Sequence, residues 1–126
     1  MSKYRPVDVR VWTDRKVSSL SPEAKLLWIF LLTAPSSIAI PGVVIGGDAA
    51  LAEQLGVSQE LFGQLFRQLF QSGLPVLREG RLIWLPKALK YQPPRNPNMI
   101  KAWAVCWDDV SENNLKHQLW QELRIA

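Results

Sequence analysis

The chain has 126 residues, of which 48% are apolar and 21% are charged, a composition typical of one ordinary globular domain and not of a disordered or fibrous chain. Its one cysteine, Cys106, and its one histidine, His117, exclude an internal disulfide and a zinc module. The longest apolar run, Leu26–Leu32, has seven residues against the roughly 20 that span a bilayer, and the N-terminus lacks a signal-peptide pattern, so we expect a cytoplasmic protein.

The net charge of +4 is unevenly distributed along the chain. Residues 1–20 hold five basic and two acidic side chains, and residues 78–101 hold six basic side chains and one acidic. The rest of the chain is therefore slightly acidic. Two basic segments on such a body favour a localised surface that binds a polyanion, although solvated basic loops would give the same count.

The N-terminal third predicts an extended lead-in followed by one long helix. Alternating valines precede Trp12, which we expect to anchor the lead-in to the core. Ser21 and Pro22 then begin a helix as its N-cap and first residue, and the helix runs to about Thr33. Because residues 26–32 are all apolar, we expect it to be the central helix of the core.

The middle of the chain predicts two closely spaced helices and a β-hairpin. Residues 38–45 indicate a short edge strand or an extended turn, after which Asp48 is expected to cap a helix that ends at Gly56. Ser58 opens a second helix to Ser72, with Gly73 as its stop. Two apolar runs within residues 74–86 flank the turn Arg78–Arg81, where Gly80 can adopt a left-handed backbone.

The two helices at about 48–72 predict a helix-turn-helix. Gly56 permits the tight turn, and a larger side chain there is expected to strain the backbone and to crowd the helices. The second helix buries Leu61, Phe62, Leu65, Phe66, Leu69 and Phe70 and leaves a face of glutamines with Arg67. Such a helix can lie in the DNA major groove, where Gln pairs with adenine and Arg with guanine, although any solvated helix can carry these residues.

The order of three helices and a hairpin predicts a fold that is mainly α with a small β-hairpin, a winged helix. We expect a single domain over residues 1–126, with the wing at about 74–86 and a C-terminal helical extension at about 98–124. In that extension Asn98 caps one helix, and a second, from near Ser111, carries the stripe Leu115, Leu119 and Leu123. Between hairpin and extension, residues 86–92 predict a helical turn and residues 93–98 an irregular loop.

Several motifs together resemble the N-terminal winged-helix domain of phage and prophage replication-initiation proteins, over nearly the whole chain. They are Trp12-Thr13-Asp14, residues 20–27 (LSPEAKLL), the helix-turn-helix, residues 81–91 (RLIWLPKALKY), Pro93-Pro94 and Asn96-Pro97-Asn98. The resemblance implies binding of double-stranded DNA at or near an origin, in the nucleoid of a bacterial host. In that family a separate C-terminal part recruits the replicative helicase or its loader. These 126 residues do not include it, so we expect either one piece of such a protein or a stand-alone version that does not recruit the helicase.

The DNA-contacting residues are expected on the second helix of the motif, on the wing and on the basic segment that follows, where prolines stiffen the chain. They are Ser58, Gln59, Gln64, Arg67, Gln68, Gln71, Arg78, Arg81, Lys87, Lys90, Arg95, Asn96, Asn98 and Lys101. We expect no catalytic residue, cofactor or metal, since Asp108-Asp109 lacks a third ligand and Cys106 lacks a base. Two alternatives stay open: a transcriptional regulator, and a module that contacts a helicase, a loader or another copy of itself.

Overall fold

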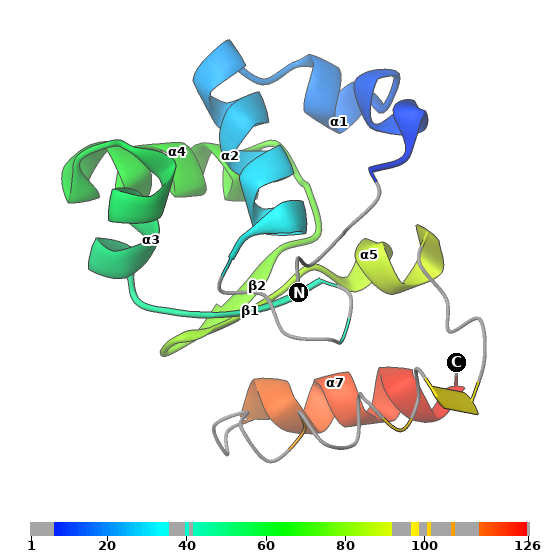
Figure 1. Ribbon diagram of the computed structural model, residues 1–126. Helices are drawn as coiled ribbons and strands as arrows, with labels where there is room; N and C mark the ends of the chain where they lie inside the picture. The colour runs from blue at the N-terminus through cyan, green and yellow to red at the C-terminus, as the bar shows by residue number, and fades with distance from the viewer. Residues whose placement is uncertain are drawn as a thin grey trace.

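The computed structural model describes residues 7–35, 40, 42–91, 97–98, 101, 107 and 114–125. In these ranges the protein is mainly helical with one small antiparallel sheet (Figure 1). The elements in chain order are η1 (Val9–Trp12), α1 (Arg15–Ser18), α2 (Pro22–Thr33), β1 (Val43–Ile45), α3 (Asp48–Leu55), α4 (Gln59–Gln71), β2 (Leu77–Glu79), β3 (Leu82–Trp84), α5 (Pro86–Tyr91) and α7 (Asn114–Ile125).

The helix boundaries follow the local signals in the sequence. The Ala24 amide donates to the Ser21 hydroxyl at 3.2 Å, and the Leu61 amide donates to the Ser58 hydroxyl at 3.1 Å, so both serines are the predicted N-caps. Gly56 ends α3 with a left-handed backbone of φ +87°. The predicted cap role of Asp48 is wrong, because Asp48 is the first residue of α3 and its carboxylate pairs with Arg78 instead.

Among the described residues, helices α2, α3 and α4 pack around the larger of two apolar clusters. From α2 the buried residues are Ala24, Leu27, Trp28 and Leu31, while Leu26 is exposed, so α2 is central to the core but not buried on all sides. Trp12 does not anchor the N-terminal segment, because its side chain is 57% exposed at the end of η1. The neighbouring α1 is anchored by buried Val17 instead.

The sheet has the strand order β1-β3-β2, with both pairs antiparallel. Strand β1 is an edge strand, the first of the two predicted alternatives, and the Leu85 amide donates to the carbonyl of Gly42, just before β1, at 2.8 Å. The hairpin turn is shorter than predicted, because Arg78 and Glu79 belong to β2 and only Gly80 and Arg81 form the turn. Gly80 has the expected positive φ, at +59°.

A second apolar cluster lies between the other face of the sheet and α7 (Figure 1). Val43, Leu82 and Trp84 point to this face and pack with Leu115 and Leu119, which confirms two positions of the predicted C-terminal stripe. Helix α7 begins among the described residues at Asn114, while Ser111 and the side chain of Leu123 lie outside them. The predicted role of Asn98 as a cap is wrong, because its own backbone is helical.

Candidate nucleic-acid interface

The turn between α3 and α4 sets the orientation of α4. Gly56, Val57 and Ser58 connect the two helices, and the amides of Gly56 and Val57 both donate to the Ala52 carbonyl, at 2.9 and 3.0 Å. A Cβ at Gly56 would meet no atom within 4 Å, so the Cβ itself does not crowd the helices, and the left-handed backbone is the feature that calls for glycine. Helix α4 then buries Phe62, Leu65, Phe66 and Leu69 against the core.

The outer face of α4 is polar and exposed. Gln64, Arg67 and Gln71 follow one another at helical spacing and are all exposed, as predicted. Gln59 and Glu60 are exposed in the first turn, and the side chain of Ser58 is committed to the cap. With one acid and one base, this face is built mainly for hydrogen bonding and not for electrostatic attraction.

Two side chains of α4 lie elsewhere than predicted. Gln68 is half-buried, because it faces α2, where its amide oxygen accepts a hydrogen bond from the Ser21 hydroxyl at 3.0 Å. Phe70 was expected in the core but is 48% exposed, since it lies at the edge of the buried stripe with its ring 5.2 Å from that of Phe66. Gln68 therefore joins α4 to α2, and Phe70 leaves an exposed ring beside the buried stripe, apart from Gln64, Arg67 and Gln71.

Arg78 is held within the protein. Its guanidinium forms an ion pair with Asp48 at 2.5 Å and lies over the Phe66 ring, 5.4 Å from the centroid. Its Nε also donates to the Gly80 carbonyl at 3.4 Å. Arg78 thus connects strand β2 to the start of α3 and to α4, a set of contacts between distant segments for which the sequence carries no local signal.

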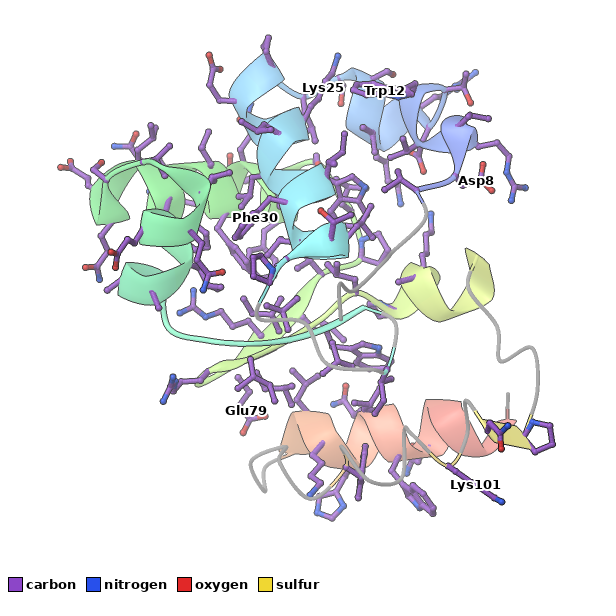
Figure 2. The ribbon with its side chains drawn as sticks, viewed as in Figure 1. Asp8, Trp12, Lys25, Phe30, Glu79 and Lys101 are labelled. Atoms are coloured by element: carbon purple, nitrogen blue, oxygen red, sulfur yellow. The ribbon has the colours of Figure 1, made fainter. Side chains whose placement is uncertain are left out.

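The other basic residues of the segment 78–101 do not gather into one patch in the described part of the chain. Arg81 is exposed at the hairpin turn, while Lys87 lies on α5, at the opposite end of β3, with its Nζ 4.0 Å from a carboxylate oxygen of Asp14 (Figure 1). Asn98 and Lys101 are exposed, and Figure 2 shows the Lys101 ammonium pointing away from α7. The side chain of Lys90 and the whole of Arg95 and Asn96 lie outside the described residues.

A small pocket that the sequence did not indicate lies between the N-terminal segment, α2 and α5. Its rim carries both signs of charge, because Asp8 pairs with Arg10 at 2.7 Å and Lys87 lies beside Asp14. Hydrogen bonds from the Arg10 side chain, and then from its backbone amide, lower the pKa of Asp8 to about 2. A balanced rim does not select an anion, so we do not add this pocket to the candidate interface.

Within the described ranges, no group of three or more His, Cys, Asp or Glu side chains could hold a metal ion, and no helix is long and apolar enough to cross a membrane. Comparisons with protein-family models, with curated proteins and with solved structures found no match to the chain.

Proposed function

We propose that the chain is a winged-helix domain that binds double-stranded DNA, at or near an origin in phage or prophage replication initiation. The order α2, β1, α3, α4, β2, β3 and the sheet order β1-β3-β2 support this assignment, with α3 and α4 as the helix-turn-helix and the β2–β3 hairpin as the wing. The replication role follows from the motifs that resemble replication-initiation proteins.

The observation that carries the proposal is the exposed polar face of α4 that follows a three-residue turn. From Gln64 to Gln71 the helix rises by about 10 Å, which is the height of about three base pairs of B-DNA. Arg67, between them, can pair with guanine, and either glutamine with adenine. Gln64, Arg67 and Gln71 are all exposed, so their side chains can reach base edges. Gln68 is bonded to Ser21, so we no longer count it among the residues that contact bases.

The wing contributes a phosphate contact through Arg81. Its side chain is exposed at the turn, where the backbone is fixed by the left-handed Gly80 and by the Gly46 amide, which donates to the Arg81 carbonyl at 2.8 Å. A contact to phosphate positions the duplex without reading its sequence. Arg78 orients the wing through Asp48, so we assign it a positioning role and not a DNA contact.

The test measures binding of fluorescently labelled duplexes by anisotropy at one fixed salt concentration. The duplexes are fragments of the neighbouring genome, followed by single-base variants of the preferred fragment. Arg67→Ala should relax the preference at one base pair, worth about 1 to 3 kcal/mol of discrimination. Arg81→Ala should weaken all duplexes equally and reduce the slope of log affinity against log salt by about one.

Lys25→Ala is the matched control, since it also removes one positive charge but lies on α2, outside both basic segments and far from the hairpin turn (Figure 2). It should change neither preference nor slope. If Arg67→Ala keeps the preference profile of the parent, α4 does not read sequence. Tighter binding of promoter fragments than of origin fragments would favour the transcriptional regulator over the replication role.

A second candidate function is a protein-interaction module, and exposed Phe70 is the observation that favours it. Exposed aromatic rings are common at protein interfaces. Sedimentation equilibrium tests contact with another copy of the chain: Phe70→Ala should abolish self-association under this alternative and should leave duplex binding unchanged under the main proposal. Duplex binding unaffected by both Arg67→Ala and Arg81→Ala would make this alternative the better one.

A further inference from the structure

The N-terminal basic segment contains two cations that the proposed interface does not use. Arg15 and Lys16 are neighbours on α1, and both side chains are exposed. In the part of the chain that the structure describes, neither side chain forms an ion pair. Both charges are thus open to a ligand at the surface.

The acids near α1 do not neutralise this pair of charges. One carboxylate oxygen of Asp14 accepts a hydrogen bond from the backbone amide of Lys16 at 2.8 Å, and the other lies 4.0 Å from the Lys87 ammonium. Glu23 is exposed in the first turn of α2 and forms no ion pair with Arg15 or Lys16. Two exposed positive charges therefore face one exposed acid, and the surface favours an anion.

The Lys16 side chain lies against the C-terminal end of α4. A Cβ built at Gly73 would lie 3.7 Å from Cε of Lys16 and 4.0 Å from its Nζ. Gly73 follows Gln71, the last residue of α4 and of its exposed polar face, by two positions. The carbonyl end of a helix carries about half a negative charge, so it orients a nearby ammonium group without cancelling its charge. Lys16 thus places a positive charge beside the polar face of α4.

Two contacts fix α1 relative to α4. Val17, next to Lys16, is buried in the larger apolar cluster. Ser21, three residues after the end of α1, donates a hydrogen bond to Gln68 of α4 at 3.0 Å. Because the backbone of α1 is already ordered against the core, a ligand that binds there has less conformational freedom to remove.

The exposed face of α4 needs attraction from its flanks. Its one acid, Glu60, and its one base, Arg67, cancel each other, and a helix in the major groove lies between two phosphate backbones. The hairpin turn supplies Arg81, and α1 lies far from that turn (Figure 1). We propose that Arg15 and Lys16 of α1 contact the phosphate backbone of the duplex that α4 reads, on the side away from the wing. This inference rests on the proposed function of α4.

The first experiment measures the affinity for the preferred duplex by anisotropy at salt concentrations between about 50 and 200 mM. Lys16→Ala should reduce the slope of log affinity against log salt by about one, so the parent should lose about 3.5-fold more affinity than the variant over this range. Arg15→Ala combined with Lys16→Ala should reduce the slope by about two. No variant should change the preference among single-base variants of the duplex, because phosphate contacts do not read sequence.

Two variants serve as controls for the charge. Lys16→Arg keeps the positive charge and should keep the slope of the parent. Lys101→Ala removes an exposed lysine that points away from α7, across the sheet from α4, and should also keep it (Figure 2). If Lys16→Ala fails to fold in a urea titration, Lys16→Gln removes the charge but keeps most of the aliphatic stem, and should reduce the slope by the same amount.

A second experiment locates the contact on the duplex. An iron chelate that cleaves the nearby DNA backbone is attached to Lys16→Cys and, in a separate protein, to Arg81→Cys. The parent labelled on its one cysteine, Cys106, gives the background pattern. Cleavage from position 16 should lie on one side of the base pair whose preference Arg67→Ala relaxes, and cleavage from position 81 on the other side.

The outcomes separate this inference from the proposed function. An unchanged slope in the double variant, together with a reduced slope in Arg81→Ala, would overturn the α1 contact and leave the proposed function standing. A cleavage pattern from position 16 equal to the background would do the same. Reduced slopes in the α1 variants without any effect of Arg67→Ala or Arg81→Ala would support the α1 contact and contradict the role of α4. A parent chain that binds no duplex would overturn both.

Discussion

Gly42 and Gly56 allow the cost of a close backbone contact to be separated from the cost of a left-handed backbone. Their φ values are nearly equal, at +80° and +87°. A Cβ added at Gly56 would meet nothing within 4 Å, whereas one added at Gly42 would lie 2.5 Å from the Leu85 carbonyl oxygen and 2.7 Å from Cβ of Ala88. Alanine at the two sites therefore differs mainly in the space available to it.

At Gly56 alanine meets only backbone strain, which costs about 1 to 2 kcal/mol, so we expect Gly56→Ala to lower the free energy of unfolding by about 1 kcal/mol. At Gly42 the same strain is joined by overpacking of about 1 to 3 kcal/mol. The 2.8 Å hydrogen bond from Leu85 to the Gly42 carbonyl must also shift, at about 1 kcal/mol. We expect Gly42→Ala to cost about 3 kcal/mol or more.

Urea unfolding followed by tryptophan fluorescence gives both free energies on the same chain, and the slope against urea checks that each variant unfolds in the same way. The expected difference between the two variants is about 2 kcal/mol or more, with Gly42→Ala the less stable. Equal urea midpoints would refute the close approach of Gly42 to the chain that joins β3 to α5. A cost of zero at Gly56 would refute the left-handed turn.

Three further predictions test contacts that join the elements. In a double-mutant cycle of Asp48→Asn and Arg78→Met, unfolding should show a coupling of about 1 kcal/mol, because both side chains are 28% exposed; additive costs would mean that the ion pair adds nothing. In thermal unfolding, Ser58→Ala should lower the free energy of unfolding by about 1 kcal/mol and Ser58→Gly by a few tenths. Equal losses in the two variants would show that Ser58 does not cap α4. Leu119→Ala should cost about 2 to 5 kcal/mol in urea unfolding, and a cost below about 0.5 would mean that α7 does not cover the sheet.

The sequence predicted the elements whose signals are local. The hydroxyls of Ser21 and Ser58 each accept a hydrogen bond from the backbone amide three residues later, so both serines are N-caps. Gly56 and Gly80 have the positive φ that their turns need. These signals place α2, α3, α4 and the hairpin, and with them the exposed face of α4. None of them requires knowledge of a contact between distant parts of the chain.

The sequence did not predict the contacts that join those elements. Gln68 lies 47 residues from Ser21, and Glu79 accepts a hydrogen bond from the Leu115 amide, 36 residues away. Side chains of these types are also common on solvated surfaces, so nothing marks them as paired until the elements are assembled. Phe70 fails for a related reason, since the width of a buried stripe depends on which helices pack beside it.

Because α7 covers one face of the sheet, it limits how far the chain can be shortened from its C-terminal end. A fragment that stops after α5 would keep α4 and the hairpin. It would expose Val43, Leu82 and Trp84 to solvent as one contiguous apolar patch. A sheet with strands of only three residues is marginally stable by itself. A fragment that exposes its apolar face is therefore expected to aggregate. Polar replacements at those three positions would have to accompany the shortening.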